Sequence, residues 1–304
     1  MNPTPPAEAL EFGASARKAF DALGGVELAR RAEADPSVRA ADAWQVLASL
    51  GAPDVDPRDD LDTAVAAGEL ARAAGRVALP YPVVGFLLRR DGRPYAPLPA
   101  GRPLIDHGDL FPAWNVDGGA IAEPVDSRLG TKLGPFVVPV SPAAGRAGSE
   151  PLEHLLHLAL TGWLVLGALE RSVELAVEHV SGRIQFGKPL ATFQAVQFQL
   201  ADAAVAVDGL RELCRYTLWR VFLAGDSALP DVLALRLHAL DCGRSVLRTA
   251  QQLFGAAGVC DEYDVSVLVR HTQPALRLPS GAERTAAQLA AAVERSGFTS
   301  LFGS

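Results

Sequence analysis

The stretch Arg183-Ile-Gln-Phe-Gly-Lys-Pro-Leu190 interrupts two long runs of helical periodicity and determines how the second half of the chain is organised. It places an arginine, an amide, an aromatic ring and a glycine in a tight break, and Gln194 follows eleven residues after Arg183. A second break of the same kind, Gln252-Leu-Phe-Gly255-Ala-Ala-Gly258, comes far downstream. Because glycine and proline end helices and permit sharp turns, the two segments predict where long helices meet.

After residue 150, apolar residues recur at alternating steps of three and four, which is typical of amphipathic helices. Three long helices follow this spacing, and a shorter fourth helix is predicted from about Ala282 to Arg295. The predicted breaks fall at 182–189, 225–230 and 255–279. Long helices with mostly short links pack antiparallel, so residues 151–304 are predicted to form a four-helix bundle. The apolar seams are Leu155, Ala159, Gly162, Leu166, Leu169, Val173, Ala176 and Val180; Val196, Leu200, Ala203, Val207, Leu210, Cys214 and Val221; and Val232, Leu235, Ala239, Cys242, Val246 and Leu253.

Two further regions precede the predicted bundle. Residues 1–90 are rich in alanine and are predicted to be helical, with one helix ended by Gly51 and another ended by Gly75. Residues 91–150 contain nine prolines and nine glycines, and their apolar stretches are short. These stretches predict brief strands between turns, and so a reduced sheet or a loose connector. They lie at 103–105, 114–116 and 135–140.

Composition excludes several classes of function. The chain has 304 residues, 49% of them hydrophobic, which suffices for a large core, and its net charge of −7 argues against a nucleic-acid partner. The first residues have neither the basic nor the apolar region of a secretory signal. The most apolar stretch, 155–169, is shorter than a membrane span requires, so we expect a buried core helix and no membrane association.

Cysteine and histidine usage favours a reducing, cytoplasmic location without a metal site. Cys214, Cys242 and Cys260 include no C-x-x-C pair, so we expect three small core residues and no disulfide framework. His154 and His157 lie three residues apart, but two histidines without a third ligand are weak evidence for zinc. We expect both at a helix surface.

The order and spacing of the motifs resemble the acyl-CoA dehydrogenase family. The resemblance covers about residues 150–281 well and the N-terminal region loosely. It implies a mainly α, acyl-CoA dehydrogenase-like fold with an N-terminal helical region, a reduced β middle region and a C-terminal four-helix bundle. The strings that carry it are Ala168-Leu-Glu-Arg-Ser-Val-Glu-Leu-Ala-Val-Glu-His-Val-Ser-Gly-Arg-Ile-Gln-Phe-Gly-Lys-Pro-Leu-Ala-Thr-Phe-Gln194, Leu200-Ala-Asp202 and Gln251-Gln-Leu-Phe-Gly-Ala-Ala-Gly258.

The resemblance implies one half of an FAD site. Members of the family hold FAD in an extended form across a subunit interface, and these motifs receive its adenine and pyrophosphate end. A guanidinium suits a pyrophosphate through paired charge-assisted hydrogen bonds, an aromatic ring packs on a flat ring system, and glycine lets the backbone come close. The implied cofactor-binding residues are Arg183, Gln185, Phe186, Gln194, Gln252, Gly255 and Ala256.

The catalytic carboxylate of the family has no counterpart here. The base must accept an α-proton in a pocket that raises its pKa, and most members carry it as glutamate before a glycine. In this chain that position falls on Pro279 or Ser280. The alternative position in a minority of the family falls on or near His157, and a shifted register would present Glu283. Neither makes a conventional base.

The middle region also lacks the family's flavin-ring motif. The nearest match to it is Ala122-Glu-Pro-Val125, and about 60 residues stand where the family needs roughly twice as many. We therefore predict the non-catalytic subunit of a heteromeric FAD-dependent acyl-CoA dehydrogenase, similar to those of the actinobacterial α2β2 heterotetramers that degrade sterol side chains. A full-length partner would supply the base, the ring pocket and most of the acyl-CoA contacts. The alternatives are a self-sufficient enzyme that uses His157 or Glu283, and a flavin-free scaffold.

Overall fold

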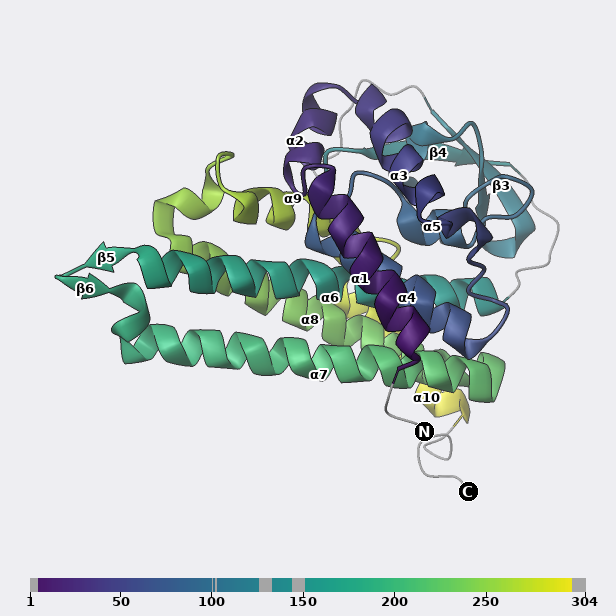
Figure 1. Cartoon of the computed structure of the whole chain (residues 1–304). Helices are drawn as coiled ribbons and strands as arrows, with labels where there is room; N and C mark the ends of the chain where they lie inside the picture. Colours follow the sequence, from purple (N-terminus) through teal and green to yellow (C-terminus); the bar gives the residue numbers. More distant parts are fainter. Residues whose placement is uncertain (1–4, 100, 102, 126–132, 144–150, 297–304) are drawn as a thin grey trace.

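The computed structural model describes residues 5–99, 101, 103–125, 133–143 and 151–296 as a helical N-terminal region, a small sheet and a helical bundle. Figure 1 shows the sheet and the N-terminal helices together beside one end of the long bundle helices. The N-terminal helices are α1 (Ala7–Ala22), α2 (Glu27–Ala34), α3 (Trp44–Ser49), α4 (Leu61–Arg76) and α5 (Val83–Leu87), with a π-helical turn at Arg39–Ala43. The predicted helix ends are confirmed at Gly51, where φ is +74°, and within one residue of Gly75.

The bundle is built from α6 (Pro151–Gly182), α7 (Gln194–Ala224) and α8 (Leu229–Phe254), which run antiparallel (Figure 1), with α10 (Ala282–Ser296) packed against α8. These four helices confirm the four predicted ones. The prediction of an uninterrupted break at 255–279 is wrong, because this segment contains a further helix, α9 (Asp264–Arg277). Pro274 lies inside α9 and Arg270 and His271 interrupt its apolar pattern, which is why periodicity did not reveal it.

The middle region is a reduced antiparallel sheet with the strand order β1-β4-β3-β2. Its strands are β1 (Leu104–Asp106), β2 (Trp114–Val116), β3 (Ala120–Pro124) and β4 (Val137–Pro142). Three of them match the predicted apolar stretches, and β3 was not predicted. Trp114, 1% exposed, fills one face of the sheet and donates its indole hydrogen to the carbonyl of Gly108 at 2.9 Å.

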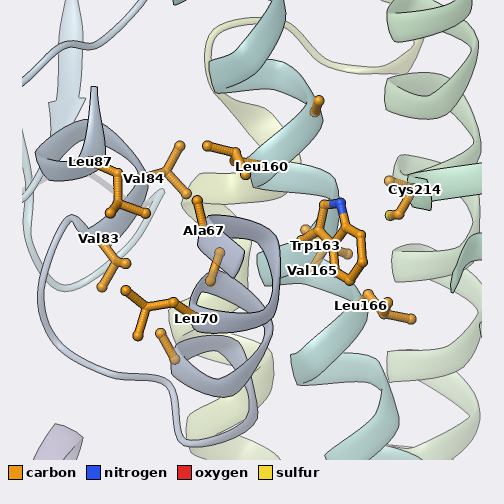
Figure 2. Close-up of a cluster of buried hydrophobic side chains, with 14 of the residues drawn as sticks. Ala67, Leu70, Val83, Val84, Leu87, Leu160, Trp163, Val165, Leu166 and Cys214 are labelled. Atoms are coloured by element: carbon orange, nitrogen blue, oxygen red, sulfur yellow. The ribbon is translucent and has the colours of Figure 1, made fainter. Parts of the chain in front are cut away.

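The core forms where α4 and α5 pack on α6 (Figure 2). Gly75 on α4 and Gly167 on α6 let the two backbones touch: a Cβ atom at Gly75 would collide with the carbonyl of Leu164, and one at Gly167 with the carbonyl of Arg72. Gly68 makes room for the buried ring of Trp163 in the same way. By length and apolarity α6 could cross a membrane, but most of its apolar stretch is buried inside the fold, as expected of a core helix.

Two expectations about individual side chains are wrong. Cys214 and Cys242 are buried as predicted, but Cys260 is exposed because it follows a short 3₁₀ turn at the bundle end instead of a core helix. His157 is half-buried and faces the sheet region, because α6 is covered along this side by the N-terminal and middle regions. Within the described residues, no group of three His, Cys, Asp or Glu side chains could hold a metal ion.

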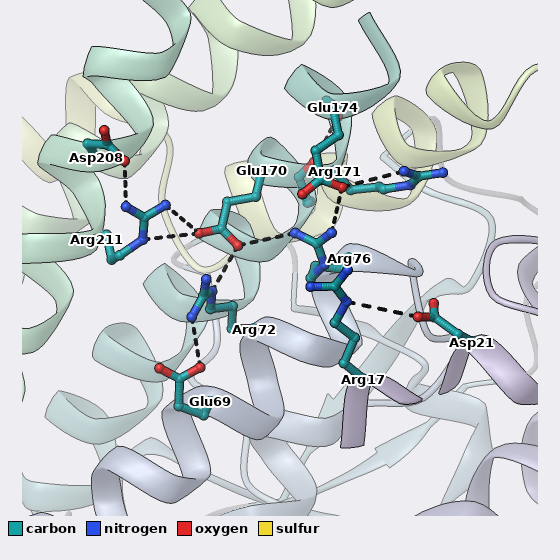
Figure 3. A network of polar contacts seen from close by, with 12 residues as sticks. Arg17, Asp21, Glu69, Arg72, Arg76, Glu170, Arg171, Glu174, Asp208 and Arg211 are labelled. Carbon is teal, nitrogen blue, oxygen red and sulfur yellow. Dashed lines mark hydrogen bonds and ion pairs between the residues drawn. The ribbon is translucent and has the colours of Figure 1, made fainter. Parts of the chain in front are cut away.

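A buried carboxylate joins three helices at the centre of the molecule (Figure 3). Glu170 on α6 accepts from Arg72 Nε at 2.8 Å, from Arg76 Nη1 at 3.4 Å and from Arg211 Nη2 at 2.8 Å. Arg72 and Arg76 belong to α4 and Arg211 belongs to α7, so one side chain ties the N-terminal region to the bundle. The side chain of Glu170 is only 6% exposed, and its loss would leave the three arginines with one carboxylate each, Glu69, Glu174 and Asp208.

We expect Glu170→Gln to lower the free energy of unfolding by about 2 kcal/mol, since charge-assisted hydrogen bonds at a buried site are lost while each arginine keeps a second carboxylate. The measurement is denaturant-induced unfolding at neutral pH. Glu178→Gln is the matched control, because Glu178 is on the same helix and binds Arg171 at 3.3 Å with its side chain 64% exposed. Its effect should stay below about 0.5 kcal/mol. Equal effects of the two substitutions would contradict this account.

Candidate functional site

The segment around Arg183 forms a hairpin at the far end of the bundle (Figure 1). The strands β5 (Ile184–Gln185) and β6 (Lys188–Pro189) pair in register, and the turn between them places Phe186 and Gly187 at positive φ, +53° and +78°. Phe186 is 89% exposed as a consequence. The amide of Arg183 donates to the carbonyl of His179 at 2.9 Å, so the arginine continues directly from the last turn of α6.

Gln252 and Gly255 lie at the same end of the bundle. Gly255 ends α8 with φ +63°, and its amide donates to the carbonyl of Gln252. Ala256 follows in an exposed 3₁₀ turn. The imidazole of His179 stacks on Phe254 with centroids 4.1 Å apart and an interplanar angle of 18°, which joins the ends of α6 and α8.

Gln194 begins α7 directly after the hairpin and is exposed. Phe193 before it contacts Phe186 edge-on at 6.2 Å and lies under the Lys188 ammonium at 4.3 Å. The hairpin therefore packs against Phe193, the residue that precedes α7. The seven residues predicted to contact FAD, which come from four separate elements, thus gather at one end of the bundle.

The electrostatics of this end suit an anion. Within the described residues the exposed Arg183 side chain forms no salt bridge, so its guanidinium is available for a ligand. Burial, and secondarily the Arg183 charge, hold the pKa of His179 below its usual value, so the neighbouring imidazole is neutral near pH 7. A guanidinium without a salt-bridge partner can donate two parallel hydrogen bonds to one phosphate group, and here exposed side-chain amides lie at the same end of the bundle.

A cavity of about 130 Å³ lies elsewhere, where α4, α6, α9 and the sheet meet. Its wall is largely apolar, and it includes Pro279, one of the two residues in the predicted base position, together with Leu278. The Ser280 hydroxyl instead bonds with Thr285 Oγ1 at 2.9 Å. No carboxylate therefore comes from this loop, in agreement with the sequence.

A buried cation holds that loop in place. Arg236 on α8 is 2% exposed and donates to the backbone carbonyls of Ala275, Leu278 (2.8 Å) and Ser280 (3.0 Å). Burial lowers the pKa of Arg236 to about 10, which leaves it charged at neutral pH. Three backbone carbonyls thus bind the Arg236 guanidinium in place of a carboxylate, and these hydrogen bonds hold the loop in one conformation.

The two alternative bases differ in their surroundings. His157 lines the cavity, and burial lowers its pKa to about 3. An imidazole whose conjugate acid is so acidic is a weak proton acceptor. Glu283 is exposed on α10 and is not among the residues that line the cavity.

Asp106 is a group that sequence reasoning missed. It lines the cavity from the end of β1, and burial raises its pKa to about 7, against the Arg39 charge, which lowers it. His107 and His271 line the cavity beside it. No sequence signal separates Asp106 from other acids of the middle region, because its burial depends on residues distant in sequence that line the same cavity.

The bundle end and the cavity are far apart. His157 and Gly182 are 25 residues apart on the same helix, which at 1.5 Å per residue corresponds to about 38 Å. Figure 1 shows α6 continuous between the sheet region and the hairpin. A ligand bound at Arg183 therefore does not share a site with one bound in the cavity of the same chain.

Comparison with known proteins identifies the C-terminal region. The family described as "Acyl-CoA dehydrogenase, C-terminal domain" matches residues 158–293. Among curated proteins, "Probable acyl-CoA dehydrogenase FadE2" of Mycobacterium tuberculosis is 28% identical over 161 residues, which are 53% of this chain and 37% of that protein. The matched part of the chain thus spans less than half of the length of such relatives.

Solved structures match almost the whole chain. The ChsE4-ChsE5 complex of Mycobacterium tuberculosis contains a chain with a TM-score of 0.75 and 18% identity, covering 97% of this chain and 99% of that one. A variant of the Tcur3481-Tcur3483 steroid ACAD reaches 0.81 at 17% identity, covering 95% and 98%. At this identity the likeness concerns the fold. The chain therefore has the acyl-CoA dehydrogenase fold and carries, at residues 158–293, the C-terminal domain of the acyl-CoA dehydrogenase family.

Proposed function

We propose that this chain is the non-catalytic subunit of a heteromeric, cytoplasmic, FAD-dependent acyl-CoA dehydrogenase. Its bundle end would bind the adenine and pyrophosphate end of a flavin, and a full-length homologous partner would supply the ring pocket and the base. The complex would desaturate the acyl group of an acyl-CoA thioester between its α and β carbons. The likeness to the fold of a steroid ACAD supports a sterol-derived acyl group.

The separation along α6 is the observation that carries the proposal. The ribityl chain and three fused rings of FAD extend roughly 15 Å from the pyrophosphate at about 1.5 Å per bond. A flavin held at Arg183 therefore ends far short of a cavity about 38 Å away along α6. Its reactive ring must lie against another chain.

The cavity itself does not fit the flavin ring. Its volume of about 130 Å³ is well below the 300–1,000 Å³ that is typical of pockets for ligands of that size. The loop that presents the family's base contributes Leu278 and Pro279 to the wall. We therefore assign no redox step to this chain.

The bundle end fits the other half of FAD. Arg183 can donate two charge-assisted hydrogen bonds to the pyrophosphate, and the exposed amides of Gln194 and Gln252 can both donate and accept. Around Gly255 there is open space, so backbone can approach the cofactor. Phe186 is exposed enough to pack on a ring system. Together these groups bind and orient one end of a cofactor whose chemistry occurs in the partner.

A self-sufficient enzyme is the second candidate function, and Asp106 is the observation that favours it. A carboxyl group with a pKa of about 7 in an apolar cavity is suited to accept a proton at neutral pH. His157 and Glu283 are weaker candidates because one is a poor proton acceptor and the other is exposed. The third candidate, a flavin-free scaffold, differs from the first in predicting no role for Arg183.

We expect Arg183→Ala and Gln252→Ala to reduce the flavin-to-protein ratio of the complex purified after co-expression with its genomic neighbour. Losing a charge-assisted contact should weaken FAD binding about tenfold or more. Flavin absorbance of the purified complex is the measurement. The control is Arg17→Ala, since Arg17 is a similarly exposed arginine whose side chain is 56% exposed on α1. Unchanged flavin content in both variants would favour the scaffold, and stoichiometric FAD with turnover in this chain alone would refute the proposal.

We expect Asp106→Asn to stabilise the protein in a pH-dependent way. Because the folded-state pKa is raised from 3.8 to about 7, the unfolded chain loses this proton more easily and wild-type stability falls as pH rises through that interval. The free energy of unfolding of the variant should exceed that of the wild type by about 2 kcal/mol at pH 8, and the two should be almost equal at pH 4. The value of about 2 kcal/mol is about half of what the pKa difference corresponds to, because the Asp106 side chain is 33% exposed and solvent screens its charge.

Unfolding curves at the two pH values measure this effect. Asp91→Asn is the control, because the Asp91 side chain is 82% exposed. Turnover of the complex separates the two functions: it should be unchanged in Asp106→Asn if the chain is non-catalytic and abolished if Asp106 is a base. A pH-independent effect on stability would contradict the raised pKa.

A further inference from the structure

The cavity has the features of a binding site, although the proposed function assigns it neither the base nor the flavin ring. Side chains from every region of the molecule converge on it, and most of them are apolar. Tyr81, Tyr95 and Trp114 give it an aromatic wall, and Leu104, Ile105 and Leu164 give it an aliphatic one. The rings of Tyr95 and His157 contact edge to face with their centroids 5.8 Å apart, so the His157 imidazole adjoins the aromatic wall.

Most polar groups in the wall are already satisfied. Tyr95 donates to Asp117 at 2.5 Å, Thr161 to the carbonyl of His157 at 2.7 Å, and Thr272 to the carbonyl of Leu268 at 2.6 Å. His271 Nε2 lies 2.6 Å from Glu33. Nδ1 of His157 is the exception: it is buried and has no hydrogen-bond partner in the described part of the chain. A buried polar atom without a partner is costly and is normally satisfied by protein, water or a ligand.

We propose that this cavity binds a small neutral compound with an apolar body and one hydroxyl group, which forms a hydrogen bond with His157 Nδ1. A hydroxyl fits either tautomer of the imidazole, because it can both donate and accept. That the compound is bound without being desaturated rests on the proposed function, in which the flavin ring lies in the partner. The binding itself is a property of this chain and is tested without the partner.

Charge and size narrow the class of ligand. No lysine or arginine is among the described residues that line the cavity, and Asp106 is an acid, so a carboxylate or a phosphate would be buried without compensation. A cation is disfavoured because Arg39 already places positive charge near Asp106. A cavity of about 150 Å³ accommodates benzene, so a volume of about 130 Å³ suits an apolar body of roughly six to eight non-hydrogen atoms.

Benzyl alcohol, toluene, benzylamine and benzoate form a matched series to test this inference. Ligand-observed NMR or calorimetry on the purified full-length chain at pH 8 should show saturable, millimolar binding of benzyl alcohol, a range set by its few atoms. Toluene should bind more weakly, and benzoate and benzylamine should not compete. Equal binding of either charged analogue, or no binding of benzyl alcohol, would overturn the proposal.

Substitution of the imidazole provides the second test. His157→Leu should weaken benzyl alcohol about fivefold, since one hydrogen bond is lost, and leave toluene unchanged. His157→Gln should restore part of the affinity, and His238→Leu, on α8 and outside the cavity, should have no effect. Unchanged affinity of His157→Leu for benzyl alcohol would contradict the assignment of the hydrogen bond. Displacement of benzyl alcohol by butyryl-CoA at a lower concentration than by free alcohols would also contradict the proposal, because the ligand would then be a thioester.

Discussion

The crossing of α4 and α6 is the contact on which the rest of the structure depends. Gly75 and Gly167 let the two backbones meet, and Glu170 then binds arginines from α4 and α7 around the crossing. The glycines make the contact close, and the buried carboxylate joins arginines of two other helices at one point. Gly75 also lines the cavity, so the contact that attaches the N-terminal region to the bundle also shapes this largely apolar cavity.

The length of α6 separates two functions that a dehydrogenase must combine. At one end the helix supports a hairpin with an exposed arginine and aromatic ring, and at the other it forms the wall of a small cavity. In the function that we propose, a cofactor at the first end completes its site with another molecule. The same length leaves the second end free to bind something else, which is why the cavity and the flavin end can be tested independently.

The sequence predicted those parts of the fold that depend on local pattern. The long helices, the helix end at Gly51 and three short strands follow from periodicity and from glycine and proline, as does the break after Gly182, but not the hairpin that the break forms. It did not predict α9, because Pro274 and two charged residues obscure a helix whose apolar side is buried by tertiary contacts. Asp106 and the exposure of Cys260 were missed for a related reason: burial at these positions depends on partners distant in sequence. The bundle-end residues were anticipated by family resemblance, and spacing alone would not have selected them.

The position of the flavin in the purified complex tests the central claim most directly. A cryo-EM or crystal structure of this chain with its partner and FAD would show which chain contacts each end of the cofactor. We predict that the pyrophosphate lies within hydrogen-bond distance of Arg183 and that the isoalloxazine ring lies wholly against the partner. A ring seated beside Asp106 and His157 in this chain, or a complex whose flavin makes no contact with Arg183, would contradict the account.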